Sequence, residues 1–246
     1  MPMLRSSLFT VAFLILGCSA VSAAELRVLV FSRTTGFRHD SIPAGIALIQ
    51  RLGREHGFAV EATENPRRFT PKSLRAFRVV VFLNTTGDVL DARQQSALEG
   101  WVRGGGGWVG VHSAADTEHS WPFYGKLLGE GAWFAGHPAI QTAAIEVESA
   151  THPSAAHLPP RFSFADEWYN FRVDPRGFAH VLLSIDETTY DPGAGAMGDH
   201  PIAWYRRLGK GRAWYTNLGH RIETYAEPAF VQHLLGGITW AAARNR

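Results

Sequence analysis

The chain has 246 residues, of which 46% are hydrophobic and 12% aromatic, and its formal net charge is +2 at pH 7. A chain of this length and apolar content can bury a substantial core. Charges of both signs are scattered along it, without the basic stripe that is typical of nucleic-acid binding. We therefore expect a folded protein that binds a small molecule and no nucleic acid.

Residues 1–24 have the pattern of an export signal. A basic residue precedes the apolar run over residues 8–16, and small residues lead to the end of the segment. The run is shorter than the roughly 20 residues that a transmembrane helix needs. We expect cleavage after Ala23 or Ala24, a single mature domain of residues 25–246, and a periplasmic or extracellular location.

The one cysteine of the sequence, Cys18, lies within this segment. Ile15, Leu16 and Gly17 precede it and form a passable lipobox, so a lipid-anchored protein is the alternative. After cleavage at the alanines no cysteine would remain, which excludes disulfides and cysteine-based zinc sites in the mature chain. Both forms place the protein outside the cytoplasm.

Three β-branched, apolar runs predict strands that are buried on both faces of a parallel sheet: residues 26–31, 78–83 and 108–111. A polar loop follows each run, and helices are predicted over residues 43–56 and 91–103. Strand, loop and helix alternate in this way in doubly wound α/β domains. We expect a mostly parallel sheet with helices on both faces and all three loops at one sheet edge.

The pattern is looser elsewhere. Residues 151–171 are rich in histidine, proline and aromatic residues, and they predict a long functional loop or an inserted cap. Strands in the C-terminal half predict an added antiparallel portion of the sheet. The other predicted elements are strands over residues 58–63, 140–147, 180–185, 201–205 and 211–216, a short helix within 66–74, and a closing helix over 228–243.

Chemically useful side chains gather in the loops that end the three buried runs. They are Thr35, Arg38 and His39 after the first run, Asp88 after the second, and His112, Ser113 and Asp116 after the third. Ligands bind at this edge of open α/β sheets because loops and helix N-termini converge there. Ser113 can be a nucleophile or a helix N-cap. His220 joins the group if the strand over residues 211–216 runs parallel.

The segment Asp166-Glu167-Trp168-Tyr169 combines carboxylates with aromatic rings. Burial beside these rings would raise the pKa of Glu167, which suits a general acid or base. An exposed acidic pair is the alternative. Trp168 and Tyr169 would offer flat faces on which the apolar CH faces of a sugar can stack.

Eight short motifs follow one another along the chain: Thr34-Thr35-Gly36-Phe37-Arg38-His39, Thr85-Thr86-Gly87-Asp88, Gly110-Val111-His112-Ser113-Ala114-Ala115-Asp116, Gly136-His137-Pro138, His152-Pro153, Asp166-Glu167-Trp168-Tyr169, His200-Pro201-Ile202-Ala203-Trp204 and Gly219-His220. Together these motifs resemble the ThuA-like family, which is named for a trehalose-utilisation protein. The resemblance implies a fold related to class I glutamine amidotransferases, which is flavodoxin-like, and substrates among trehalose-type or keto-glycosides. Those relatives have a cysteine nucleophile at a strand-to-helix turn. His112 occupies that position here, so glutaminase activity is not expected.

Eleven histidines raise the question of a metal ion. Several histidines with a carboxylate can hold zinc or a similar divalent ion. The pool of candidate ligands is His112, His137, Glu167 and His220. These residues would have to come together from distant loops, since the sequence has no H-E-x-x-H motif. A divalent metal is therefore an alternative, and no other cofactor is indicated.

We expect an acid/base enzyme that acts on a glycoside or keto-sugar. His112 and Glu167 would transfer protons, while His39 and His220 would orient or polarise substrate oxygens. The predicted substrate-binding residues are Thr35, Arg38, Asp88, Ser113, Asp116, His137, Trp168 and Tyr169. A non-catalytic sugar-binding module and a metal-dependent hydrolase are the alternatives. A homo-oligomer is left open.

Overall fold

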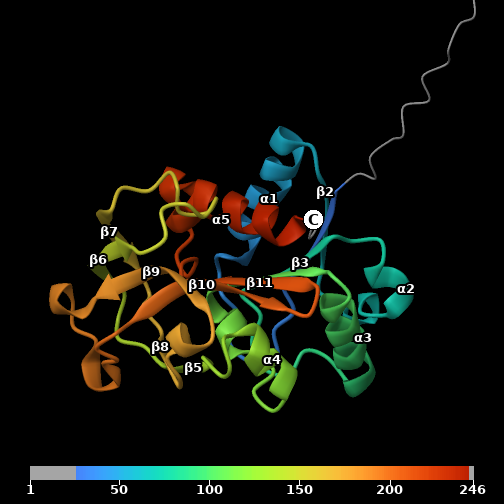
Figure 1. Ribbon diagram of the computed structural model, residues 1–246, viewed down its shortest axis with the longest axis horizontal. Coiled ribbons are helices and arrows are strands. Elements are labelled where there is room, and N and C mark those ends of the chain that lie inside the picture. Colours follow the sequence, from blue (N-terminus) through green and yellow to red (C-terminus); the bar gives the residue numbers. More distant parts are fainter. Residues whose placement is uncertain (1–25, 244–246) are drawn as a thin grey trace, which may run out of the picture.

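A nine-stranded mixed sheet forms the centre of the molecule in the computed structural model, which describes residues 26–243 (Figure 1). The strand order is β2-β1-β3-β4-β11-β10-β9-β6-β7. Strands β2 to β11 in this order are parallel, and the others pair antiparallel with their neighbours. The predicted export signal of residues 1–24 and its alternative, a lipid anchor on Cys18, lie outside the described residues.

The elements have the following bounds. The parallel strands are β1 (Arg27–Phe31), β2 (Ala59–Thr63), β3 (Val79–Leu83), β4 (Gly107–Val111) and β11 (Gly211–Thr216). The antiparallel strands are β6 (Gln141–Val147), β7 (Arg161–Asp166), β9 (His180–Asp186) and β10 (Pro201–Leu208), and a separate pair is formed by β5 (Phe134–Gly136) and β8 (Asn170–Phe171). The α-helices are α1 (Ile42–His56), α2 (Pro71–Leu74), α3 (Ala92–Arg103), α4 (Pro122–Leu127) and α5 (Pro228–Ala242).

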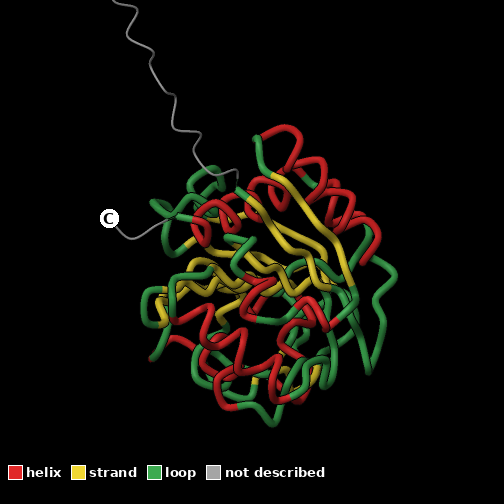
Figure 2. Tube along the Cα trace, turned by 90° about the vertical axis from the view of Figure 1, so that its right-hand side faces the viewer, coloured by secondary structure: helices red, strands yellow, loops and turns green. Residues whose placement is uncertain are grey.

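The central strands are apolar along their whole length because both of their faces are covered. Every residue of β3 and β4 is buried. On one face α1 and α5 pack through residues such as Leu48 and Leu234. On the other face α2, α3 and α4 pack through residues such as Leu98 and Tyr124. Figures 1 and 2 show these two helical layers with the sheet between them. The predicted α/β fold class is confirmed.

Parallel pairing brings the carboxyl ends of β1, β3, β4 and β11 to one edge of the sheet. Val111 at the end of β4 is level with Leu83 of β3 and with Thr216 of β11. Strand β11 is therefore parallel to β4, and the turn that follows it reaches the same edge as the polar loops. His220 therefore joins the group of polar side chains at this edge, as predicted for a parallel strand over residues 211–216.

The segment over residues 151–171 is not one long loop. It contains β7, which pairs with β6 at the edge of the sheet, and the short strand β8. Only one face of β7 contacts the core, so Phe164 is buried while Arg161 and Ser163 are exposed. A short edge strand of this kind lacks the continuous apolar run of the central strands, and the surrounding prolines conceal its alternation.

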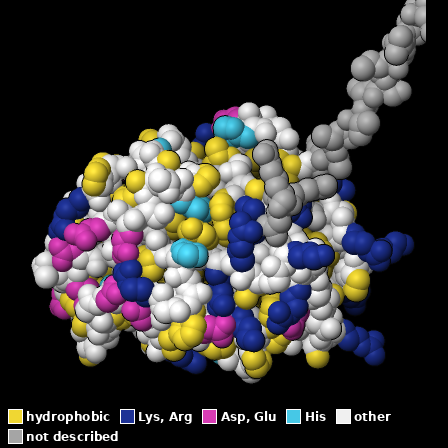
Figure 3. Space-filling model, in the orientation of Figure 1, with side chains coloured by type: hydrophobic (Ala, Val, Ile, Leu, Met, Phe, Trp, Pro, Cys, Tyr) yellow, Lys and Arg dark blue, Asp and Glu magenta, His cyan; other side chains and the backbone are white. Residues whose placement is uncertain are grey.

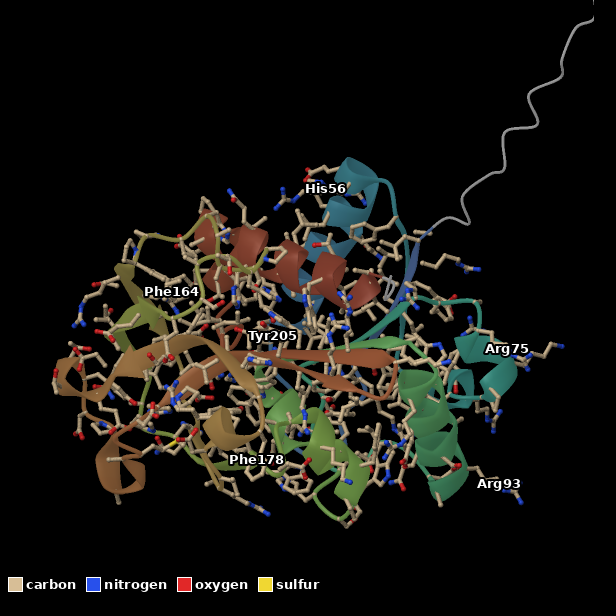
Figure 4. All side chains as sticks on the ribbon, in the orientation of Figure 1. His56, Arg75, Arg93, Phe164, Phe178 and Tyr205 are labelled. Carbon is tan, nitrogen blue, oxygen red and sulfur yellow. The ribbon has the colours of Figure 1, made fainter. Side chains whose placement is uncertain are left out.

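Positively and negatively charged side chains gather in different regions of the face that Figure 3 shows. Lysine and arginine gather over the half with α2 and α3, and acidic residues gather over the antiparallel half. Figure 4 shows Arg75 and Arg93 directed outward from the α2 and α3 end. Among residues 26–243, no helix combines the length and the apolar character needed to cross a membrane.

Candidate functional site

The chain turns sharply at His112, directly after β4. This residue has φ = 50° and opens a 3-10 helix over His112–Asp116. A non-glycine residue in the left-handed region is uncommon and is retained only where its surroundings hold it. Two hydrogen bonds do so: the Tyr215 hydroxyl donates to the His112 carbonyl at 2.8 Å, and His112 Nδ1 donates to the Asn217 carbonyl at 2.7 Å. The bend directs the buried ring toward the sheet edge, with Nε2 unbonded to backbone.

Glu167 lies between β7 and β8, and three histidines contact its carboxylate. Oε2 lies 3.3 Å from His112 Nε2 and 3.1 Å from His220 Nδ1, while Oε1 lies 3.1 Å from His137 Nδ1. Burial alone would raise the pKa of Glu167, as the sequence predicts, but hydrogen bonds and charge interactions with His112 and His220 outweigh it. The pKa is held well below its usual range, so the predicted rise is wrong and the carboxylate is ionised.

The pKa values of His39 and His220 are shifted in opposite directions. Burial, reinforced by the charges of His112 and His220, lowers the pKa of His39 to about 3, so His39 is neutral. Burial also lowers the pKa of His220, but the hydrogen bond and charge of Glu167 outweigh that effect and the net shift is upward. The ring of His39 stands edge-on to those of His112 and His220, with centroids 4.9 and 5.1 Å away.

A cavity of about 310 Å³ opens above this cluster. Its lining residues are Phe37, His39, Thr86, Asp116, Phe134, His137, Glu167, Tyr169 and His220. Tyr169 packs against His112 and Phe134 at centroid distances of 4.3 and 4.4 Å, which gives the cavity an aromatic wall. Asp116 adds a polar group to this lining, and its carboxylate pairs with His119 at 2.8 Å. Pockets for small polar ligands combine such apolar walls with a few converging polar groups.

The structure brings most of the predicted site residues together. Those at the cluster or lining the cavity are His39, His112, Asp116, His137, Glu167, Tyr169 and His220. Ser113 lies one layer deeper, where its hydroxyl contacts His39 Nδ1 at 3.3 Å. Its side chain bonds this ring instead of capping a helix.

Besides Ser113, four predicted substrate-binding residues lie outside the cavity lining. Arg38 pairs with Glu64 at the surface at 2.7 Å. The Thr35 hydroxyl donates to the Asp88 carbonyl at 3.3 Å, a contact that holds two loops together. Trp168 is fully buried and its indole N–H donates to the Gln141 carbonyl at 2.9 Å. The aromatic surface available to a ligand is therefore Tyr169 with Phe37 and Phe134.

Asp166 and Asn217 support the site and were not predicted as part of it. Asp166 is fully buried, and its carboxylate accepts hydrogen bonds from the backbone N–H groups of Glu167, Gly219 and Arg221 and from the Thr224 hydroxyl. The Asn217 side chain accepts from the Tyr169 N–H at 3.1 Å and donates to the Glu167 carbonyl at 2.7 Å. A polar residue at the end of a buried strand is the sequence signal for Asn217, and Asp166 adjoins the predicted Glu167.

The cluster also has the composition of a metal site. Ligand atoms of His39, His112, Glu167 and His220 all lie within 4.8 Å of one another. This set differs from the predicted pool by one residue, because His39 takes the place of His137. His137 contacts the second oxygen of Glu167 and is exposed at the rim of the cavity.

These features define a class of protein: an α/β domain with a histidine at the strand-to-helix turn and a pocket of imidazoles, one carboxylate and aromatic rings. The chain belongs to the ThuA family, described as trehalose utilisation, whose pattern matches residues 27–241. The family gives the chain a carbohydrate-related role. No curated protein matches the chain.

Solved structures are similar over most of the chain. A ThuA-like protein from Bacteroides uniformis ATCC 8492 has 27% identity and a TM-score of 0.76, over 92% of this chain and 95% of that one. A ThuA-like protein from Parabacteroides merdae ATCC 43184 has 18% identity and a TM-score of 0.72, over 89% and 90%. A β-galactosidase from Bacillus circulans sp. alkalophilus shares the fold at 14% identity and a TM-score of 0.55, where 89% of this chain matches 31% of that one.

Proposed function

We propose that this ThuA-family protein is an exported enzyme that transfers protons on a glycoside or keto-sugar. The observation that carries the proposal is the contact of one ionised carboxylate, Glu167, with three histidines beneath an aromatic-walled cavity. Acid/base catalysis needs a donor and an acceptor held within hydrogen-bond reach of one substrate. Glutaminase chemistry is not part of the proposal, because His112 stands where a cysteine nucleophile would be required.

His220 is the proton donor in this proposal. Its side chain is 22% exposed, so it reaches the cavity, whereas the His112 side chain is fully buried beneath it. The Glu167 carboxylate, 3.1 Å from His220 Nδ1, stabilises the imidazolium that donates. His112 orients the same carboxylate from below. His137 and Asp116 line the rim, where they can hydrogen-bond sugar hydroxyls.

The cavity has room for a sugar. Its volume of about 310 Å³ lies at the lower end of the range for small-molecule sites. Tyr169, Phe134 and the 67% exposed Phe37 offer apolar ring faces, and the opposite groups are polar. Sugars present both an apolar CH face and hydroxyl groups, so this division of the lining favours a carbohydrate.

The first test is turnover of trehalose, other glucosyl disaccharides and their 3-keto forms, with products identified by NMR. Glu167→Gln removes the charge that stabilises the imidazolium, and His220→Ala removes the donor. We expect each to lower kcat by about 100-fold to 10,000-fold. His56→Ala is the matched control, since His56 is exposed at the end of α1 (Figure 4) and does not line the cavity.

Folding of each variant is checked by its unfolding midpoint. Full turnover by folded Glu167→Gln and His220→Ala variants would contradict the roles proposed for Glu167 and His220 in proton transfer. Binding of sugars by the unchanged protein without any product would favour the non-catalytic module instead.

Export is part of the same proposal, with residues 1–24 removed from a single domain that begins at residue 25. The support is the order of a basic residue, an apolar run and small residues at the start of the sequence. Expression of the full chain followed by N-terminal sequencing of the periplasmic protein is expected to give an end at Ala24 or Glu25. A full-length protein that stays in the cytoplasm contradicts export, and a lipid-modified Cys18 establishes the anchored alternative.

A further inference from the structure

The centre of the histidine cluster brings ring nitrogens and a carboxylate oxygen into mutual contact. A carbonyl oxygen can only accept, so His112 Nδ1 donates to the Asn217 carbonyl, and Nε2 is the ring nitrogen directed into the cluster. It faces Glu167 Oε2, a carboxylate oxygen, at 3.3 Å.

A second histidine meets the same pair of atoms. His220 Nδ1 lies 3.1 Å from Glu167 Oε2 and 3.3 Å from His112 Nε2. Two ring nitrogens and one carboxylate oxygen, each able to bind a metal ion through a lone pair, therefore converge on one point beneath the cavity.

We propose that His39, His112, Glu167 and His220 bind one divalent first-row transition-metal ion, for which zinc is the probe. Four ligands at about 2.0–2.1 Å from a tetrahedral zinc are about 3.3–3.4 Å apart. The three separations among His112 Nε2, His220 Nδ1 and Glu167 Oε2 are 3.3, 3.1 and 3.3 Å. Three of the four ligand atoms therefore already stand close to the edges of a coordination polyhedron, and the fourth, from His39, lies within 4.8 Å of them.

The chemical type of the four ligand atoms restricts the choice of metal ion. Three imidazole nitrogens and one carboxylate oxygen suit zinc, manganese, iron, cobalt or nickel, whereas calcium and magnesium prefer oxygen ligands alone. Each metal-binding histidine usually has its second ring nitrogen held by a neighbouring group. Here Asn217 holds His112, and the Ser113 hydroxyl lies 3.3 Å from His39 Nδ1, which leaves Nε2 of His39 as its ligand atom.

The bound ion would be reached from the cavity. His39, Glu167 and His220 all belong to the cavity lining, whereas His112 closes the site from below. A sugar hydroxyl or keto oxygen that enters the cavity is thus the class of ligand that would approach the ion. With the ion bound, His220 is a neutral ligand and no longer the proton donor proposed above, and the ion itself polarises the sugar oxygen. Binding of the ion can be measured without turnover.

The test uses the mature chain, treated with a chelator and then titrated with Zn²⁺ by calorimetry. We expect one ion per chain, and a Co²⁺ absorption band typical of a four- or five-coordinate site. His220→Ala and His39→Ala should each weaken Zn²⁺ binding by about 100-fold or more, and Ser113→Ala by about 10-fold, as for loss of an outer contact. His56→Ala is the control and should change the affinity less than 3-fold, because His56 is exposed and belongs neither to the four ligands nor to the cavity lining.

Two results would overturn the inference. One is the absence of Zn²⁺ and Co²⁺ binding tighter than 10 µM in the folded protein. The other is stoichiometric binding that persists unchanged in both the His220→Ala and the His39→Ala variants, which would place the ion elsewhere. Either result leaves the sugar assay unaffected, and a metal-loaded protein without turnover would instead count against the proposed function.

Discussion

Asn217 does not line the cavity, but its hydrogen bonds position three residues of the site: His112, Glu167 and Tyr169. Its backbone carbonyl fixes the His112 ring, and its side-chain amide joins the Glu167 carbonyl and the Tyr169 N–H. One buried residue thus sets the relative position of the strand-to-helix turn and of the carboxylate. Because both of its amide groups are used, no other residue of similar size can replace it without leaving a buried polar group unpaired.

Asp166 has a comparable role in the turn that carries His220. Its two carboxylate oxygens accept four hydrogen bonds, two of them from the N–H groups of Gly219 and Arg221 on either side of His220. A buried carboxylate is favourable only when its oxygens are satisfied in this way. The position of His220 therefore depends on Asp166, although the two side chains have different functions.

Asp166→Asn should lower the free energy of unfolding by about 2–4 kcal/mol, because the amide NH₂ would face N–H donors and leave them unpaired. It should also lower kcat, because the His220 turn loses its support. Urea unfolding and the sugar assay measure the two effects. Asp40→Asn is the control, since Asp40 is exposed near the same edge. Unchanged stability in Asp166→Asn would contradict the role given to its four hydrogen bonds.

At the scale of elements, the strands that form the site were predictable because they are buried on both faces. After Arg27 at the start of β1, the strands β1, β3 and β4 carry no polar residue, so only a central parallel strand fits them. Their shared edge then follows from topology. The edge strand β7 was missed because only one of its faces is buried.

Which side chain of a loop faces the ligand was harder to predict. In extended backbone successive side chains point to opposite sides, so Glu167 and Tyr169 face the cavity while Trp168 faces the core. In the first loop, His39 turns inward and Arg38 outward. The sequence contains the residues of the site, but the choice between neighbours depends on turns held by residues far away in the chain.

At the scale of the whole molecule, a histidine remote from the site couples stability to pH. His233 is buried in α5, where Nδ1 donates to the Ser154 carbonyl and Nε2 contacts the Thr216 hydroxyl. Burial lowers its pKa to about 3, despite the bond to Ser154, which favours the charged form. Below about pH 6.5, His233 binds a proton in the unfolded chain but stays neutral in the folded chain. The free energy of unfolding therefore falls as the pH drops from 6.5 toward 3.

Between pH 7 and pH 5 this one group should remove about 2 kcal/mol from the free energy of unfolding. We expect His233→Gln, which cannot take up the proton, to lose about 2 kcal/mol less than the unchanged protein over this interval. Chemical denaturation at the two pH values gives the comparison. Replacement of the exposed His180 by Gln serves as the control and should leave the pH dependence as it is. An identical pH dependence in the His233→Gln variant would argue against a neutral buried ring.

The last strand of the chain, β11, lies in the middle of the sheet between β4 and β10. Sheet order and order of synthesis therefore differ. A chain that ends before β11 lacks the strand that pairs with both β4 and β10. An open edge invites incorrect pairing. The turn directly after β11 supplies Asn217 and His220. A nascent chain therefore completes its sheet and its histidine cluster together, near the end of synthesis. A truncated product would have neither.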